Sequence, residues 1–423
     1  MCELSYYGNC DPETEDEEYC IFHRPNKNEK EAEEFWRKFF DRFKPEEEKI
    51  EGGKIRRFVF KEDLDCSGYV FPASFGETGM VVRTHEHARP FCYSIFKGNV
   101  DLSEATFSGD VDFSYAKFEK KAVFSNAEFS GDVIFLGTKF SRVAVFSNAK
   151  FEGKAFFSGA TFSRALFIKA TFSETADFSG TEFEKKAFFL GTKFSGNVHF
   201  SYAKFEKNMD FSEAKFSRVA VFSNAEFSGD VIFVKTNFSA ADFIGTKFSR
   251  ALFIKATFSG DAYFSGTEFE KKADFSNAEF SGDVHFSYAK FSEEAVFSNV
   301  KFEKESDFLG ATFSGNVDFS GANFEEKSDF SEAKFEKSVL FSNTRFYKFL
   351  NFLRTKFPTL KDDAEDILSY VSFRSVYFEH PEWIVSDGIE GKAKISFINT
   401  DISRVVFRNC SFDFLYDEFL LKK

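Results

Sequence analysis

Phenylalanine recurs through the middle of the chain at steps of five and six residues in near-strict alternation. Two residues before nearly every one of these phenylalanines stands a small or β-branched residue. Because residues two apart in an extended segment share a face, we expect the small residue and the phenylalanine to point inward together. Their neighbours, mostly Ser, Lys, Glu, Asp and Thr, then point outward. The series runs from Phe107 to Phe357 and opens with the pairs Ala105 and Phe107, Val111 and Phe113, and Ala116 and Phe118.

This spacing predicts short strands joined by corners. An α-helix needs apolar residues about 3.6 positions apart, which steps of five and six do not supply. Period-two segments of three or four residues, each followed by a corner such as Ser108-Gly109-Asp110 or Ser125-Asn126, suit a square-sided coil. Two steps of five and two of six give about 22 residues per coil, with the extra residue bulging at one corner of every second side.

Two stretches depart from the alternation. Between Phe157 and Phe172, and between Phe233 and Phe258, every step is five, and the alternation then resumes in phase. We expect single corner residues to be missing there while the four sides continue. Roughly 47 inward centres divided among four sides give about 11 to 12 coils, and at about 4.8 Å per coil a rod on the order of 55 Å long.

The repeat resembles that of the pentapeptide-repeat family, as typified by Ala105-Thr106-Phe107-Ser108-Gly109 and Ala160-Thr161-Phe162-Ser163-Arg164. The resemblance implies an all-β fold, a right-handed, four-sided parallel β-helix with a small residue and a Leu or Phe at its two inward positions. This sequence departs from the commoner form of the repeat because Phe holds nearly every centre and alternate sides carry an extra residue.

The chain divides into four parts on these patterns. Residues 1–50 hold a Cys/His cluster and an amphipathic capping helix over 29–43, 51–95 form irregular early coils, 96–357 form the β-helix, and 358–423 form an insertion with a terminal coil. Within the last part we expect a short helix from Asp362 to Tyr370 and repeat spacing over 395–412. Caps are needed because the ends of a solenoid expose inward side chains and unpaired strand groups.

Charge and composition limit the location and the class of protein. The formal net charge is −13, of which about −7 lies in residues 1–95, about −4 in 358–423, and only about −2 in the middle. No window approaches eighteen consecutive apolar residues, and Met1-Cys2-Glu3-Leu4 lacks the basic and apolar parts of a signal peptide. Six cysteines are too sparse for a disulfide framework. We therefore expect a cytoplasmic protein.

The first cysteines suggest a metal site. Cys2, Cys10, Cys20 and His23 supply three thiolates and an imidazole, which is a complete tetrahedral set for structural zinc. The spacing is loose, and three reduced thiols with an unrelated histidine are the alternative. The same opening is similar to the start of one pentapeptide-repeat subfamily, which favours zinc. Such a closed site leaves no open position for catalysis.

A second Cys/His group is a weaker candidate. His85, Glu86 and His87 lie near Cys66 and Cys92 in the sequence, but nothing orders them, so a polar loop is the favoured interpretation. His199 and His285 each precede a central phenylalanine, so we expect them to point outward as surface residues.

Apolar residues also occupy outward positions just before the central phenylalanine. Exposed apolar patches mark partner sites, although rows of such residues are also typical of plain strand propensity. The candidate partner surface consists of Val123, Val145, Leu166, Phe188, Ile232 and Leu252, with Ile134, Phe156, Val221 and Tyr263 on the opposite side.

The sequence favours a non-enzymatic scaffold that presents flat faces to an unknown protein partner. The alternative, borrowed from the resemblance, is a DNA mimic that binds and inhibits a topoisomerase such as gyrase. Duplex DNA carries one charge per about 1.7 Å, whereas the middle of this chain is close to neutral, with Asp307, Asp318 and Asp329 as a local acidic group. Contact with a membrane surface stays open. We expect no nucleic-acid binding, because there is no Lys/Arg cluster with exposed aromatics, and no catalysis, because no catalytic or cofactor motif is present.

Overall fold

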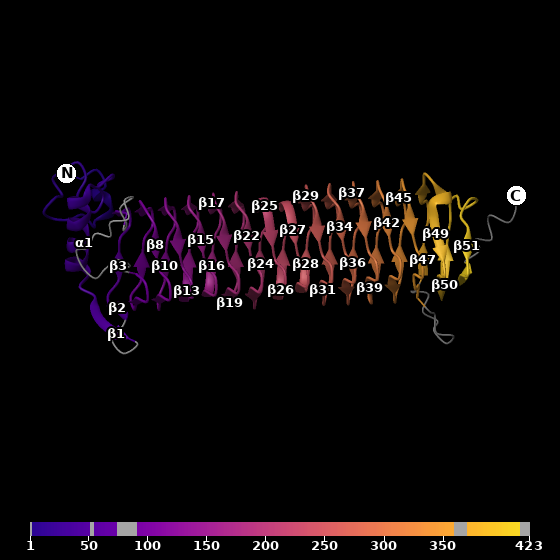
Figure 1. The fold of residues 1–423 in the computed structure, drawn as a ribbon, viewed down its shortest axis with the longest axis horizontal. Coiled ribbons are helices and arrows are strands. Elements are labelled where there is room, and N and C mark those ends of the chain that lie inside the picture. Colours follow the sequence, from indigo (N-terminus) through magenta and orange to yellow (C-terminus); the bar gives the residue numbers. More distant parts are fainter. Residues whose placement is uncertain (1, 51–54, 74–90, 359–369, 415–423) are drawn as a thin grey trace. The chain divides into compact units, whose positions relative to one another are not determined.

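The computed structural model describes residues 2–50, 55–73, 91–358 and 370–414. The chain forms two compact units, the first made of residues 1–210 with 215–217 and the second of 211–214 with 218–423. Each unit is built almost entirely from short parallel strands stacked coil upon coil (Figure 1). Each is therefore a β-solenoid, as the phenylalanine period predicts.

One coil of the first unit shows the four sides. Strands β7 (Thr106–Phe107), β8 (Val111–Asp112), β9 (Lys117–Phe118) and β10 (Ala122–Val123) follow one another around it. Each pairs in parallel with residues 22 positions later in the chain. β7 pairs with β11 (Glu128–Phe129), β8 pairs with β12 (Val133–Ile134), and β9 and β10 both pair with the longer strand β13 (Lys139–Val145). The predicted coil length is confirmed.

The core is a set of stacked aromatic rings. Phe113, Phe135 and Phe157 occupy one side of three successive coils, with neighbouring ring centroids 4.9 Å apart. Phe124 meets Phe135 across the interior at 5.7 Å in an edge-to-face arrangement, a favourable geometry for aromatic pairs. Every one of these rings is fully buried, so the predicted inward positions are confirmed.

Threonine at the small inward position satisfies its hydroxyl inside the core. Thr138 is fully buried, and its Oγ1 donates a hydrogen bond of 2.7 Å to the carbonyl of Phe113 in the preceding coil. Thr181 and Thr192 make the same bond at 2.8 and 2.7 Å to Phe157 and Phe167. A buried polar group is thereby tolerated because it is paired.

The missing corner residues shorten single coils without losing a side. β13 pairs with β16 (Thr161–Leu166) through Phe140↔Phe162, 22 residues apart, and Val145↔Leu166, 21 apart, with a bulge between Phe140 and Val143. In the second unit, β26 (Glu226–Ile232) and β28 (Lys247–Leu252) show the same kind of shift between Phe227 and Asp230. The expected loss of single corner residues without loss of a side is therefore confirmed, and it appears as a register shift between the longer and the shorter strand.

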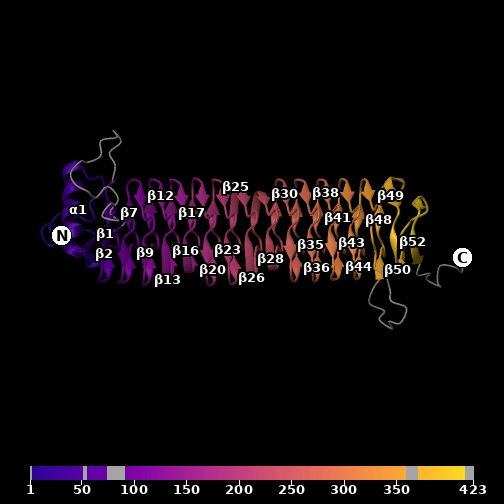
Figure 2. The same cartoon turned by 60° about the horizontal axis from the view of Figure 1, so that its bottom comes forward.

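The N-terminal end of the first unit is covered by helix α1 (Glu29–Phe43), which confirms the predicted helix and its bounds. Asn28 and Glu31 form a capping box that fixes its start. Phe35 and Phe39 are fully buried, with Phe35 5.3 Å from Phe71 and Phe39 6.0 Å from Phe91. An antiparallel hairpin of β1 (Glu46–Ile50) and β2 (Ile55–Phe60) follows, and β2 pairs with β5 (Ile95–Phe96) (Figure 2).

The sequence predicts irregular early coils over 51–95, but β2 of the hairpin lies near the start of this range, residues 74–90 lie outside the described residues, and the first coil strands begin at Leu64. β3 (Leu64–Asp65) pairs with β6 (Val100–Asp101), and β4 (Val70–Phe71) pairs with β7.

The second unit ends in larger coils. These contain β47 (Tyr370–Ser372), β48 (Tyr377–Phe378), the 3-10 turn η3 (Pro381–Trp383), β49 (Ile384–Asp387), β50 (Glu390–Ser396), β51 (Phe407–Arg408) and β52 (Ser411–Phe414). β50 and β52 pair in parallel, which confirms a terminal coil. The helix expected from Asp362 falls outside the described residues, and Tyr370 begins a strand instead.

The described residues of this end therefore hold strands and one 3-10 turn rather than a helical cap. No helix in the described part of the chain is long and apolar enough to cross a membrane.

Candidate metal centre and partner surface

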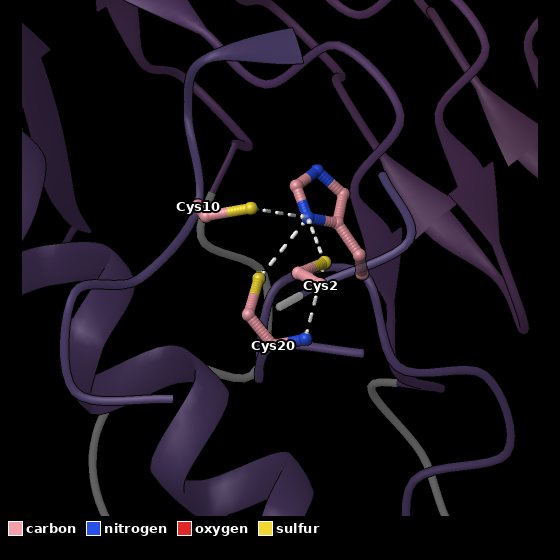
Figure 3. Close-up of side chains that lie close together, drawn as sticks. Cys2, Cys10 and Cys20 are labelled. Carbon is pink, nitrogen blue, oxygen red and sulfur yellow. Dashed lines mark hydrogen bonds between the residues drawn. The ribbon is translucent and has the colours of Figure 1, made fainter. Parts of the chain in front are cut away.

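Cys2, Cys10, Cys20 and His23 converge at the N-terminal end of the first unit. Their ligand atoms all lie within 4.8 Å of one another, and all but the Cys10 side chain are buried. The Nδ1 of His23 is 3.7 Å from the Sγ of Cys2, 3.6 Å from that of Cys10 and 3.0 Å from that of Cys20 (Figure 3). Among the described residues, no other Cys, His, Asp or Glu side chains form such a group.

Local turns bring the four residues together. A 3-10 turn over Ser5–Tyr7 ends at Gly8, whose φ of 72° favours glycine, and it turns the chain between Cys2 and Cys10. At the other end of the segment, the amides of His23 and Arg24 donate to the carbonyl of Cys20 at 3.0 and 2.9 Å, which folds Cys20 and His23 onto one side.

Two of the three sulfur–nitrogen separations fit a tetrahedral ion, and the third, from Cys20 to His23, is shorter at 3.0 Å. With Zn–S near 2.3 Å and Zn–N near 2.05 Å, ideal tetrahedral angles put sulfur about 3.8 Å from sulfur and about 3.6 Å from nitrogen. Two of the three sulfur–nitrogen distances lie within 0.1 Å of that value. The cluster can therefore hold a metal ion.

The surroundings favour ligation over protonation of the histidine. Burial is the main reason that the pKa of His23 falls to about 4, so the ring is neutral near pH 7 and can offer Nδ1 as a ligand.

The thiols of the cluster differ in pKa. Burial alone would raise the pKa of Cys2, but hydrogen bonds from the backbone of Cys20 and Leu4 and from the neighbouring thiols lower it overall. Burial, with the adjacent thiols, raises the pKa of Cys10 to about 12.

Two basic side chains border the cluster. The Nζ of Lys27 donates to the carbonyls of Arg24 at 2.5 Å and Val70 at 2.7 Å, and Arg42 donates to the carbonyls of Asn9 at 2.9 Å and Cys10 at 3.2 Å. Burial lowers the pKa of Lys27 to about 7. A divalent ion with three thiolates carries one net negative charge, which the guanidinium of Arg42 offsets.

The second Cys/His candidate is not assembled by the described residues. Cys66 is buried and Cys92 is partly exposed, and neither joins the first cluster. His85, Glu86 and His87 lie outside the described residues. His199 and His285 are half-buried on outward strand positions, as expected.

The candidate partner residues of the first unit form one column. Val123 pairs with Val145, Val145 with Leu166, and Leu166 with Phe188, through β10, β13, β16 and β20 (Ala187–Phe188). All four side chains are partly exposed. Asp101 precedes them and Asp210 follows them in the same register. We call Val123, Val145, Leu166 and Phe188 the apolar column.

The other two candidates lie in the second unit, where the pattern is broken. Ile232 pairs with Leu252, but Asp274 follows directly, and Val296 and Leu340 then alternate with Asp318. The six candidate residues thus form a run of four and a run of two.

The structure gives the aspartates at this position a role that the sequence did not reveal. The Oδ1 of Asp101 accepts the amide of Ser103 at 2.9 Å, Asp274 accepts that of Ser276 at 3.0 Å, and Asp318 that of Ser320 at 2.8 Å. These side chains cap the turn that follows the central residue, as Asx-turns do. The residues of the apolar column cannot make this bond.

The repeat architecture identifies the family. The family described as pentapeptide repeats (9 copies) matches residues 91–139, 135–181, 167–212, 200–247, 243–290 and 275–323, which together span more than half of the chain. The chain belongs to the pentapeptide-repeat family. Its fold is the pentapeptide-repeat β-helix, as the sequence resemblance implies.

Two solved structures match parts of this chain. QnrB1, a plasmid-mediated fluoroquinolone resistance protein, is 20% identical, with 57% of this chain and 88% of QnrB1 covered and a TM-score of 0.25. HetL, involved in heterocyst differentiation regulation in the cyanobacterium Nostoc sp. strain PCC 7120, is 21% identical, with 53% and 88% covered and a TM-score of 0.22. A comparison with curated proteins gave no match.

Proposed function

We propose that this chain is a non-enzymatic scaffold that binds a protein partner through the apolar column. The observation that carries the proposal is the run of four successive coils, at Val123, Val145, Leu166 and Phe188, in which an apolar side chain replaces a turn-capping aspartate. Each replacement gives up a hydrogen bond and leaves apolar surface partly exposed. A continuous apolar patch of this kind favours a docking surface.

Strand propensity alone explains this column poorly. β-branched and aromatic residues favour strands, which covers Val123, Val145 and Phe188 but not Leu166, and the strands at these positions are only two to seven residues long. The turn after Leu166 and the turn after Phe188 also carry a partly exposed apolar residue each, Ile168 and Leu190, which widens the patch.

Contacts around the outward histidines support a non-enzymatic role. The hydroxyl of Ser158 donates directly to the carboxylate of Asp177 at 2.6 Å, and His199 lies next to Asp177 in the following coil. In a catalytic triad the imidazole stands between the hydroxyl and the carboxylate. This serine and aspartate instead hold a turn, because the amide of Ser179 donates to the same carboxylate at 2.8 Å.

The acidic residues give little support to DNA mimicry. Asp307, Asp318 and Asp329 each accept the amide two residues further on, at 2.8, 2.8 and 2.9 Å, so they serve as turn caps. Outward rows also pair opposite charges, as in Lys150 with Glu128 at 2.5 Å and Lys290 with Glu268 at 2.8 Å. We therefore prefer the protein-binding scaffold over a gyrase inhibitor.

For the Cys/His cluster we propose a structural zinc site that fastens the N-terminal cap to the first coils. His23 contacts the ring of Tyr69 at 5.5 Å, and the amide of Val70 donates to the carbonyl of Phe22 at 2.8 Å. Zinc would hold residues 2–23 in one shape, and these two contacts would then join that segment to the strand that begins at Val70. Zinc ligation needs the thiols of Cys2, Cys10 and Cys20 in reduced form, so we further propose a reducing compartment such as the cytoplasm.

A pull-down with matched variants tests the scaffold proposal. The test variant carries Val145→Asp, Leu166→Asp and Phe188→Asp, which install the residue that the same position has in Asp101 and Asp210. The control carries Ile134→Asp and Phe156→Asp on the opposite side, where Asp112 and Asp177 occupy the same register. We expect partners of the wild-type chain to be lost from the test variant and kept by the control. Identical partner sets for all three proteins would overturn the proposal.

A further inference from the structure

A row of unpaired cations runs beside the apolar column. It occupies the corner that leads into each strand of the column, two or three residues before a column residue, and continues for one more coil to Lys207, three residues before Asp210. All seven cations are exposed, and none lies within ion-pair distance of a carboxylate in the described part of the chain, whereas the same corners hold only three acidic residues, Glu119, Glu184 and Glu206. We call this row the basic ridge, which consists of Lys120, Lys121, Arg142, Arg164, Lys185, Lys186 and Lys207.

These cations are not needed to build the corner. In the second unit the corresponding corner pairs its charges, with Arg250 3.6 Å from Asp230 and Lys272 3.1 Å from Glu294. At the diagonally opposite corner of the first unit, Asp110 and Asp132 accept backbone amides of the next coil, both at 2.8 Å. The basic ridge has neither kind of bond, so its charges remain available to another molecule.

One cation links the ridge to the column. The guanidinium of Arg164 lies 5.9 Å from the ring centre of Phe188, over its face. Cationic and apolar groups thus form one continuous surface.

We infer that the apolar column and the basic ridge together bind an acidic amphipathic helix of the partner protein. The inference rests on the proposed function and specifies the chemistry of its partner. An apolar strip on such a helix would cover the column, and Asp or Glu along its border would meet the ridge. Complementary charge of this kind raises association rates and rejects basic competitors.

The spacing of the coils suits a helix better than a strand. Successive column residues lie about 4.8 Å apart, so the four span about 14 Å. Helix positions i, i+3, i+7 and i+10 rise by about 4.5, 10.5 and 15 Å, which keeps pace with the column. In an extended strand, successive residues on the same face are about 6.8 Å apart, so they do not match the spacing of about 4.8 Å between the column residues.

Strand addition is also disfavoured by the hydrogen bonding of the column. The strands that carry it bond to the coils before and after them, so this side has no free edge to which a strand could pair.

An anionic lipid surface would meet the same charges, but the exposure of the column argues against it. None of its four side chains is among the strongly exposed apolar residues, which in this unit include Tyr115 at 46% and Leu136 at 39%. Insertion into lipid needs apolar side chains that project beyond the surface. Because the side chains of the column do not project beyond the surrounding surface, the column is better suited to contact with a second protein than to insertion into lipid.

Selection from a displayed library of helical peptides with randomised faces tests the inference on the full chain. We expect selected peptides to combine apolar residues at i, i+3, i+7 and i+10 with adjacent Asp or Glu. Their affinity should fall by at least about tenfold with the ridge variant Arg142→Glu, Arg164→Glu and Lys186→Glu. The control variant Lys154→Glu, Lys193→Glu and Lys215→Glu makes the same charge change elsewhere and should bind as the wild type does.

The outcomes separate the inference from the proposed function. If the selected peptides are neutral or basic and depend on Leu166 and Phe188 but not on the ridge, the scaffold proposal survives and the acidic helix is wrong. If no selected peptide depends on either surface, both are wrong. If no helical peptide is selected, but the chain binds vesicles of four parts phosphatidylcholine and one part phosphatidylglycerol and the ridge variant does not, the occupant of this surface is a membrane and the acidic helix is wrong.

Discussion

Phe188 and Phe189 are adjacent in the chain, and their side chains point to opposite faces of the same β-sheet of the solenoid. Phe189 is fully buried, and its ring stacks on that of Phe167 with centroids 4.8 Å apart. Phe188 is partly exposed beneath Arg164. The alternation of side chains along a strand separates a structural phenylalanine from a surface one.

This pair allows a matched stability test. Phe189→Ala removes a ring from the stacked core and should cost about 3–5 kcal/mol of unfolding free energy. Phe188→Ala removes a ring that is only partly covered, and should cost less than about 1 kcal/mol. Urea titrations followed by far-ultraviolet dichroism measure both. Equal losses would contradict the assignment of inside and outside.

The column variant with three aspartates should keep its fold. Val145→Asp, Leu166→Asp and Phe188→Asp lose partly buried apolar contacts but gain the cap that Asp101 makes with Ser103. We expect the free energy of unfolding to change by less than about 1.5 kcal/mol in total, because the two effects oppose each other. A larger loss in the same titration would show that the column is structural rather than a docking surface.

Zinc should bind with one ion per chain. We expect Cys20→Ser to abolish the bound metal in elemental analysis of the purified protein, and Cys410→Ser to leave it unchanged, because Cys410 is not one of the four grouped residues and bonds the carbonyl of Ser386. Chelation of the wild type should raise hydrogen exchange in residues 2–23 and leave the coils around Phe167 protected. Metal retained by the Cys20 variant would contradict the proposal that these four residues bind zinc.

Asp177 should make stability depend on pH in the acid range. Burial would raise the pKa of Asp177, but hydrogen bonds from Ser158 and Ser179 lower it below its ordinary value of 3.8. The stabilisation is therefore complete above the unfolded pKa of 3.8 and is lost as the pH falls through the lower folded value.

The variant Asp177→Asn tests this dependence. Asn351 shows that an amide can cap the same turn, since its Oδ1 accepts the amide of Leu353 at 3.0 Å. We expect the variant to fold and to lose less stability than the wild type between pH 5 and pH 2.5 in urea titrations, by up to about 1 kcal/mol. An unchanged acid dependence would contradict the role of this carboxylate.

The period of inward residues was enough to predict most of the fold. Burial of Phe107, Phe113 and Phe118 with their small partners fixes which side of each strand faces inward, and a four-sided coil follows from the steps between them. The same reasoning located the short coils near Phe162 and Phe248, because a dropped corner residue changes the step without changing the face. Helix 29–43 followed from its aromatic spacing.

The candidate sites depended on information that the period does not hold. The intervals among Cys2, Cys10, Cys20 and His23 are irregular, and their convergence is set by turns such as that at Gly8. The capping role of Asp101 has no sequence signal of its own, because the bond is accepted from the backbone amide of Ser103, and Asp307 makes the same bond with the amide of Leu309.

The basic ridge was concealed by summing charge over the whole middle of the chain. Arg142 and Arg164 are 22 residues apart in sequence and lie at the same corner of successive coils only once the register is known. Arranging the sequence in coils of 22 residues and comparing corners would have revealed it.

Photo-cross-linking from the column tests the central claim most directly. Benzoyl-phenylalanine replaces Phe188 in one protein and Phe156, at the equivalent strand position on the opposite side, in another. After irradiation in cells that express the chain, the account predicts a discrete protein adduct from position 188 and none from position 156. No adduct from position 188, or the same adducts from both positions, would contradict it.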